Sequence, residues 1–160
     1  MYRELRLSGL KNAPQYFGST YEEEILDSKL MFEMYIKIDS PDHVMFGAFD
    51  GERLIGITGF NRMARKRAMH RGEVVQVYVE PNYRGQNIGE KLIRSVLEYA
   101  FRLDGIEQVQ LSVIAGNQKA ITLYEKLGFK TFGVQSRYFK AGDIYMDQQF
   151  MQLFKSEYSR

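Results

Sequence analysis

The sequence contains no cysteine, and only two histidines and three prolines among its 160 residues. Without cysteine the chain can form no disulfide, no thiolate site for zinc and no acyl-enzyme on a cysteine nucleophile. Two histidines, His43 and His70, are too few for a multi-histidine metal site or a histidine-rich catalytic centre. We therefore expect no metal site, and a group transfer that does not pass through sulfur of the protein.

Long apolar runs and linker-like stretches are missing as well. No apolar run approaches the roughly 18 residues of a membrane span, and residues 1–10 lack the apolar core of a signal peptide. No stretch rich in proline or serine divides the chain, while hydrophobic residues make up 44% and charged residues 26%, which is ordinary globular usage. The sequence predicts a single domain over residues 1–160, cytoplasmic and without a membrane partner.

The first quarter of the chain is expected to be mainly helical. Residues 2–7, "YRELRL", are predicted as a short strand, and residues 8–38 as helix with an interruption at 14–19. Thr20 followed by Glu23 predicts a capping box at a helix start. The next apolar residues recur every three or four positions and predict one buried helix face: Ile25, Leu26, Leu30, Met34 and Ile38.

The remaining three quarters show alternating strand and helix patterns. Strand-like runs at 43–49 and 53–60, joined by Asp50-Gly51, predict a β-hairpin. A third strand at 73–79 leads to a helix at 90–103 whose buried face is Leu92, Ile93, Val96, Leu97 and Ala100. A strand at 109–113, a helix from 117 closed by Gly128, and two last strands with a tyrosine-rich loop between them complete the chain. This order predicts an α/β (α+β) fold, a mixed sheet with helices on both faces.

The segment "YRGQNIGEKL", residues 83–92, connects a strand directly to a helix. The first amide groups of a helix lack internal partners, and with the helix dipole they form an anion site. Gly85 and Gly89 allow a ligand to approach the backbone, and Arg84 can add a charged contact to phosphate. A diphosphate is the natural ligand, although the spacing alone is equally compatible with a plain tight turn. The residues match neither a Walker loop nor a G-x-G-x-x-G fingerprint.

Two motifs resemble the GNAT N-acetyltransferase superfamily. "RGQNIG" is similar to its [QR]-x-x-G-x-[GA] acetyl-coenzyme A signature, and "GNQKAITLYEKLGF" is similar to its N-x-x-A-x-x-L-Y-x-K-x-G-F segment. The element order extends the resemblance over nearly the whole chain and implies the GNAT fold, with a largely antiparallel sheet. Asn87 stands where the family has its first glycine, and asparagine tolerates the positive φ that the turn requires.

The resemblance implies acetyl-coenzyme A as co-substrate and a primary amine, on a small molecule or a peptide, as acceptor. It places the cofactor arm along the backbone of Val77, Tyr78 and Val79. The remaining cofactor-binding residues that it implies are Arg84, Gly85, Gln86, Asn87, Ile88, Gly89, Asn117, Ala120 and Tyr124. Asn117 also has the position of an ordinary helix cap. A homodimer is compatible with the family.

Two residues are the candidates for proton transfer. Tyr124 shares a helix face with Asn117 and Ala120, and a phenol with a pKa of about 10 is protonated at neutral pH and can donate to a departing thiolate. By the resemblance, Glu73 takes the proton of the amine, directly or through water. Equally, Glu73 is a surface carboxylate paired with Arg71. Glu22 and Glu23 are alternatives as amine-binding groups, or parts of a solvated face.

The sequence thus predicts an acyltransferase that works by direct attack of the amine in a ternary complex. The alternative is a non-catalytic acyl-coenzyme A sensor on the same fold. The basic segment 62–71, "RMARKRAMHR", could meet an acidic partner, RNA or the 3′-phosphate of coenzyme A. Because no aromatic residues alternate with its charges, a solvated hairpin is favoured and a nucleic-acid partner is not.

Overall fold

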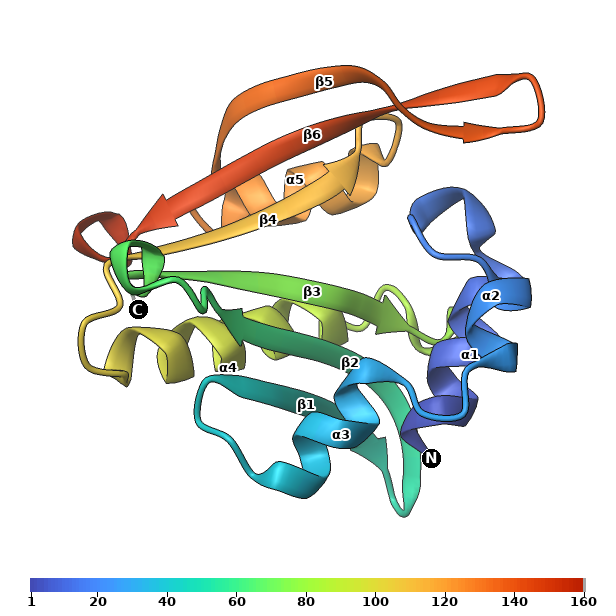
Figure 1. Ribbon diagram of the computed structural model, residues 1–160, viewed down its shortest axis with the longest axis horizontal. Helices are drawn as coiled ribbons and strands as arrows, with labels where there is room; N and C mark the ends of the chain where they lie inside the picture. The colour runs from blue at the N-terminus through green and yellow to red at the C-terminus, as the bar shows by residue number, and fades with distance from the viewer. Residues whose placement is uncertain (160) are drawn as a thin grey trace.

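In the computed structural model, which describes residues 1–159, six strands form one sheet in the order β1-β2-β3-β4-β6-β5 (Figure 1). Neighbouring strands are antiparallel except β3 and β4, which run parallel. The strands are β1 (His43–Asp50), β2 (Arg53–Arg62), β3 (Arg71–Val79), β4 (Gln108–Ile114), β5 (Lys130–Ala141) and β6 (Ile144–Phe154). The α-helices are α1 (Tyr2–Asn12), α2 (Tyr21–Leu26), α3 (Met31–Ile38), α4 (Ile88–Arg102) and α5 (Gln118–Lys126). The expectation of a mixed, largely antiparallel sheet is confirmed.

Helices cover both faces of the sheet, as expected. α4 and α5 lie on one face and share a core cluster with β3, β4 and β6. α1 and α3 lie on the other face, against β1, β2 and β3. The buried residues of α4 include all five of the predicted face: Leu92, Ile93, Val96, Leu97 and Ala100. Each of the large side chains among them stabilises the fold by about 1.5–3 kcal/mol through burial.

The prediction of a strand at residues 2–7 is wrong, because this segment begins α1. Its short alternation of apolar and polar residues also fits a helical period. Leu5, Gly9 and Leu10 form the buried face, and the ring of Tyr78 packs against Gly9 at a distance that leaves little room for a Cβ. As a helix, this segment packs against β2 and β3.

The expected helix from Thr20 to Ile38 is divided into α2 and α3. The Thr20 and Glu23 capping box is confirmed, but Leu30 begins a second helix, where the Glu33 carboxylate accepts a hydrogen bond from the Leu30 amide. Because of this break, the residues of the predicted apolar face no longer all lie on one buried side. Leu26 is 85% exposed and Ile38 68% exposed, while Phe32 is fully buried over β2. No helix within residues 1–159 is long and apolar enough to cross a membrane.

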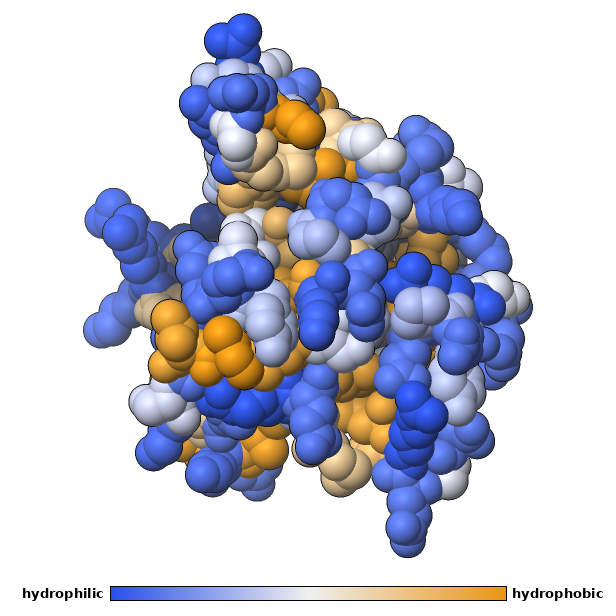
Figure 2. All heavy atoms as spheres, turned by 90° about the vertical axis from the view of Figure 1, so that its right-hand side faces the viewer, coloured by the Kyte–Doolittle hydropathy of each residue, from blue (hydrophilic) through white to orange (hydrophobic). Residues whose placement is uncertain are grey.

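The first of the two last strands, β5, is longer than the sequence indicates, because most of the tyrosine-rich segment before β6 belongs to it. The register shifts between Gln135 and Phe139, where Arg137 has a φ of +55° and its amide donates to the Asp147 carboxylate. This irregularity resembles a loop in the sequence pattern but leaves the hairpin continuous. The hairpin extends beyond the sheet, and Figure 2, where it stands at the top, shows apolar and hydrophilic side chains on it.

The parallel pair β3 and β4 determines where a ligand can bind. Their pairing covers 71–73 and 108–110, and the two strands then diverge (Figure 1). Beyond that point, neither of the facing edges has a partner among the described strands. The divergence leaves unpaired backbone groups on both sides of a gap, which a bound ligand can satisfy.

Candidate active site

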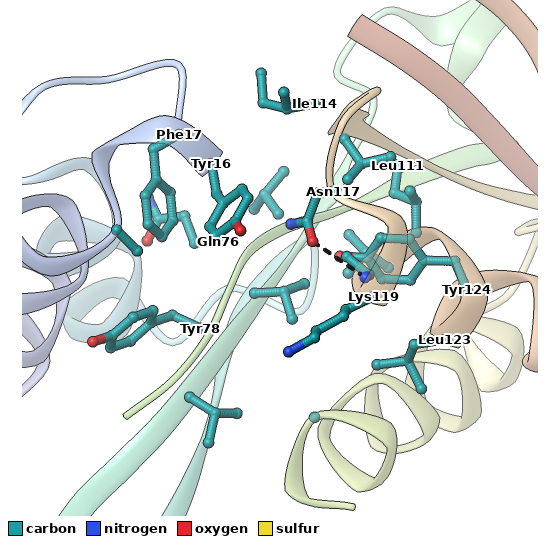
Figure 3. A pocket seen from close by; sticks show the side chains of 18 of the residues that line it. Tyr16, Phe17, Gln76, Tyr78, Leu111, Ile114, Asn117, Lys119, Leu123 and Tyr124 are labelled. Carbon is teal, nitrogen blue, oxygen red and sulfur yellow. Dashed lines mark hydrogen bonds between the residues drawn. The ribbon is translucent and has the colours of Figure 1, made fainter. Parts of the chain in front are cut away.

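A cleft of about 1200 Å³ fills the space between the diverging strands. Its walls come from the second half of β3, the loop after it, the start of α4, the end of β4 and the start of α5. The segment after α1 and the β5–β6 hairpin add residues from the other side of the sheet. In Figure 3, Asn117 and Tyr124 face Tyr16 and Phe17 across the cavity. The cleft is therefore lined by residues from both faces of the sheet.

A β-bulge shapes the β3 wall. Gln76 has a φ of +55°, and the register with β2 shifts between Ile57 and Gly59. The bulge reverses the alternation of side chains, so that Val77 packs with the α4 core and Tyr78 packs with Ile57 on the α1 side. The Gln76 side chain is fixed by the Tyr2 hydroxyl, which donates to its Oε1 at 2.8 Å. Val77, Tyr78 and Val79 all line the cleft along the free edge of β3.

The loop after β3 has the geometry of an anion site. Gly85 has a φ of +79°, and a Cβ there would meet nothing within 4 Å, so its surroundings are open to a ligand. Asn87 adopts the left-handed conformation with a φ of +59° and begins α4, and no side chain of residues 1–159 caps this helix start. The amides of the first turn are thus available to an anion. The sequence expectation that asparagine supports this turn agrees with the geometry.

Charge around the loop suits a phosphate group. The Arg84 guanidinium is exposed over the Tyr78 ring, with its Nε donating to the Val79 carbonyl at 2.9 Å. Glu90 lies in the first turn of α4, but its carboxylate binds Lys126 of α5 at 2.6 Å and Arg94 at 3.1 Å. The Lys126 ammonium lowers the pKa of Glu90. Because these cations offset its charge, Glu90 does not oppose an anion at the helix start.

The start of α5 forms the opposite wall. The Asn117 Oδ1 accepts a hydrogen bond from the Ala120 amide at 3.3 Å, so Asn117 is the helix cap that its position suggests. Asn117, Ala120 and Tyr124 nevertheless all line the cleft. In Figure 3 the Tyr124 ring extends from α5 into the cavity beside Asn117. The predicted common face of these three residues is therefore the face that α5 turns to the cleft.

Tyr124 is 6% exposed, and burial raises the pKa of its hydroxyl to about 12. Its ring packs edge-on against Phe129, with 6.1 Å between the ring centroids. The hydroxyl is therefore protonated at any physiological pH and can donate a hydrogen bond, and the packing of the ring fixes its position.

Glu73 lies outside the cleft. The described lining includes neither Glu73 nor Gln86, although it includes Val74 and Val75 directly after Glu73. Glu73 pairs with Gln110 where β3 and β4 are still joined, and points to the face opposite Val74 and α4. It is half-buried, and this burial raises the pKa of its carboxyl group. Glu22 does not line the cleft within the described residues, and Glu23 lines a smaller adjacent cavity of about 300 Å³.

The sequence missed a second group of cleft residues, on the side of α1 and the β5–β6 hairpin. They are Arg6, Ala13, Tyr16, Phe17, Gly18, Ser19, Phe139 and Gln148. Buried Arg6 pairs with Glu24 and holds its guanidinium 5.1 Å from the centre of the Phe17 ring. The signal in the sequence is slight: Pro14 and Gly18 interrupt the helical pattern, and nothing local links this segment to Phe139.

The basic segment 62–71 lies at the other end of β3. It connects β2 to the start of β3, whereas the loop that holds Arg84 follows the end of β3. Nine residues of strand span about 30 Å at 3.3 Å per residue. This distance argues against a contact between the basic segment and a phosphate held at the α4 start.

Comparison with known proteins identifies the family to which the chain belongs. The chain belongs to the acetyltransferase (GNAT) family, whose sequence profile matches residues 11–129. N-alpha-acetyltransferase RimI of Mycobacterium tuberculosis is 34% identical over 104 residues, which are 65% of this chain and 63% of that protein. Spermidine N(1)-acetyltransferase of Vibrio cholerae is 30% identical over 90 residues, 56% of this chain and 52% of that protein. The chain thus matches less than two thirds of the length of these relatives.

Solved structures share the architecture over nearly the whole chain. A putative acetyltransferase from Salmonella typhimurium, solved with its cofactor acetyl-CoA, superposes with a TM-score of 0.81 at 18% identity, covering 99% of this chain and 89% of that one. A GNAT-family acetyltransferase from Streptococcus pneumoniae gives a TM-score of 0.76 at 22% identity, covering 96% and 92%. The fold of residues 1–159 is therefore that of the GNAT acetyltransferases.

Proposed function

We propose that this protein is an N-acetyltransferase that transfers the acetyl group of acetyl-CoA to a primary amine. The observation that carries this proposal is the cleft between the free edges of β3 and β4, which joins an uncapped helix start to the phenol of Tyr124. Membership of the family supports the activity, and the named relatives are N-acetyltransferases. A cytoplasmic location and a homodimer stay predictions of the sequence.

The cofactor site comprises the end of β3 and the loop after it. The amides from Asn87 to Glu90 and the Arg84 guanidinium hold the diphosphate, while Gly85 leaves room for it. The free edge of β3 from Val77 to Val79 pairs with the amide groups of the cofactor arm, as an added strand would. Gln86 and Ile88 contribute their backbone to this loop. Acetyl-CoA supplies an acetyl group that is activated as a thioester.

Direct attack of the amine accounts for the transfer without a protein nucleophile. A bond forms between the amine nitrogen and the acetyl carbon, the bond from that carbon to sulfur breaks, and one proton moves from the amine to the thiol. A backbone amide at the end of β3, near Val79, stabilises the charge that develops on the acetyl oxygen. Because burial raises the pKa of Tyr124 to about 12, the phenol acts chiefly by donating a hydrogen bond to the departing sulfur.

Glu73 is proposed to accept the amine proton through water. Its raised pKa makes it a better base than an exposed carboxylate. Its side chain lies outside the described cleft lining, so a water between Glu73 and the amine is required. If Glu73 has this role, Glu73→Gln should lower kcat and remove the corresponding step from the pH profile of kcat/KM. An unchanged pH profile of kcat/KM would indicate that solvent, and not Glu73, accepts the amine proton.

The experiment that tests the function measures thiol release from acetyl-CoA in the presence of three amines. Spermidine, L-lysine and a peptide with N-terminal alanine represent polyamine, side-chain and terminal amines. We expect turnover with at least one of them. Saturable binding of acetyl-CoA without turnover on a broader amine panel would favour the non-catalytic sensor. Failure to bind acetyl-CoA would overturn both readings.

A further inference from the structure

One buried polar group faces the cleft without a role in holding acetyl-CoA. Gln148, on β6, is 6% exposed and lines the cleft. Its side-chain Oε1 is buried and has no hydrogen-bond partner within residues 1–159. An unpaired buried amide oxygen destabilises the folded state, because it has lost its hydrogen bonds to water without gaining others. Such a group in a folded protein calls for an explanation, and a ligand that donates to it is the simplest one.

Gln148 lies on the side of the cleft that is formed by α1, the segment after α1 and the β5–β6 hairpin, and this side is called the acceptor side below. Gln148 lies directly opposite Ile114 of β4 and Gln135 of β5, so the three side chains point to the same face of the sheet. The adjacent position Val113 belongs to the core beneath α5, which shows that Gln148 points to the opposite face. The phenol of Tyr124 therefore approaches the cleft from one face, and the Gln148 amide approaches it from the other.

Few charged side chains line the cleft on the side of Gln148. Phe139 of β5 lies on the same face as Gln148, and its ring packs onto Gly18 so closely that a Cβ on residue 18 would overlap it. This contact joins the β5–β6 hairpin to the segment after α1 and bounds the cleft on its outer side. Tyr16, Phe17 and Ile114 contribute further apolar lining, while Arg6 is already paired with Glu24. In such surroundings a single amide oxygen has a large effect on which ligand binds.

We propose that Gln148 is the positioning residue for the acceptor: its amide oxygen accepts a hydrogen bond from the amino group that is to be acetylated. This inference rests on the proposed function, because it concerns the second substrate of the same cleft. An amine nitrogen carries hydrogens that can satisfy Oε1 and still present its lone pair to the acetyl carbon. An ester or ether of the same shape has no hydrogen to donate and leaves Oε1 unpaired. The Gln148 amide thus favours amines over shape analogues without a donor.

The test replaces Gln148 by methionine, which has a similar shape and no amide. With the amine that the unaltered protein acetylates fastest, Gln148→Met should raise the KM for that amine about tenfold, equivalent to ~1.4 kcal/mol. The KM for acetyl-CoA should not change. Because the substitution removes an unpaired buried oxygen, the melting temperature without substrate should rise by about 2 °C or more. A merely structural glutamine would instead lower the melting temperature.

Gln135→Met is the matched control, since Gln135 is the exposed neighbour of Gln148 on the same sheet face and is absent from the described cleft lining. Its kinetics should equal those of the unaltered protein. If Gln148→Met does not fold, Gln148→Leu takes its place with the same expectation. Turnover with an unchanged amine KM in the Gln148 variant would overturn this inference alone. Absence of turnover by the unaltered protein with all amines would overturn the proposed function, and this inference with it.

Discussion

The two sides of the cleft, the proposed cofactor side (β3, α4 and α5) and the proposed acceptor side (α1 and the β5–β6 hairpin), offer a ligand different kinds of groups. On the side of β3, α4 and α5, the groups available are mostly backbone: a free strand edge, the amides of a helix start, and a left-handed turn at Asn87. On the side of α1 and the β5–β6 hairpin, they are side chains, among them Phe17, Phe139 and Gln148. Backbone groups suit a ligand that is common to a family, whereas side chains can change with the acceptor. The comparison predicts that substitutions on the two sides have separable effects.

The largest effect is expected from Tyr124→Phe on the cofactor side. Loss of the hydroxyl should lower kcat by about 100-fold, in the range for a single proton donor, and leave the KM for acetyl-CoA nearly unchanged. Steady-state thiol release measures both constants. Tyr99→Phe is the control, because the Tyr99 hydroxyl donates to the Pro41 carbonyl away from the cleft. An unchanged kcat in Tyr124→Phe would show that the Tyr124 hydroxyl does not take part in the reaction.

On the acceptor side, Arg6→Met should cost about 3 kcal/mol of folding stability, because it leaves the Glu24 carboxylate largely buried and unpaired. The Arg6 and Glu24 side chains are 6% and 14% exposed, whereas those of Arg53 and Glu80 are 64% and 17% exposed. Arg53→Met should therefore cost less than about 1 kcal/mol. Urea unfolding compares the two variants. The double variant Arg6→Met with Glu24→Gln should recover much of the loss, and equal costs for Arg6→Met and Arg53→Met would contradict the argument.

Substitution of Asn87 tests whether the turn before α4 forms the anion site. The left-handed conformation costs a residue with a Cβ roughly 1–2 kcal/mol, and asparagine tolerates it better than a β-branched residue. Asn87→Val should accordingly weaken acetyl-CoA binding about tenfold, whereas Asn87→Gly should bind at least as tightly as the unaltered protein. The amine KM should stay constant in both. Equal affinities of the valine and glycine variants, measured by calorimetry, would show that this turn does not form the anion site.

The smallest effect concerns the pH dependence of stability at Glu73. Burial raises the pKa of its carboxyl group in the folded protein above the unfolded value. The folded state therefore binds the proton more tightly, and this contribution is complete below the unfolded value of 4.5 and declines as pH rises through the folded value. Glu73→Gln should thus gain stability relative to the unaltered protein between pH 4.5 and pH 7. Melting curves of both proteins at pH 4.5 and pH 7 measure this gain. A difference in melting temperature between the two proteins that is the same at both pH values would contradict the prediction.

The same division between the two sides explains what the sequence could reveal. The cofactor side lies within one continuous segment, residues 71–126, in which strand alternation, the α4 face and the Asn117 cap are all local patterns. The acceptor side joins residues 6–19 to residues 139–148. Its geometry depends on contacts between distant segments, such as Phe139 on Gly18, which no local pattern indicates. The same dependence on tertiary contacts explains why the predictions of a strand at residues 2–7 and of a continuous helix after Thr20 are wrong.

The bulge at Gln76 is a further feature that the sequence did not predict. Strict alternation along β3 would place Val74, Gln76 and Tyr78 on one face, but the positive φ of Gln76 moves Tyr78 to the α1 side. Glutamine is not a residue that signals such a conformation. The Tyr2 hydroxyl that fixes its side chain belongs to α1, 74 residues earlier. The conformation of β3 at the cleft therefore depends on a contact with Tyr2, in a segment that the sequence pattern predicted to be a strand.

The most direct test of the central claim compares the binding of acetyl-CoA with that of S-acetyl-pantetheine, which has the same arm and thioester but lacks the diphosphate. If the start of α4 holds the diphosphate, calorimetric titration should give one saturable site for acetyl-CoA per chain and an affinity at least tenfold lower for S-acetyl-pantetheine. Equal affinities for the two compounds, or no binding of acetyl-CoA, would contradict the account.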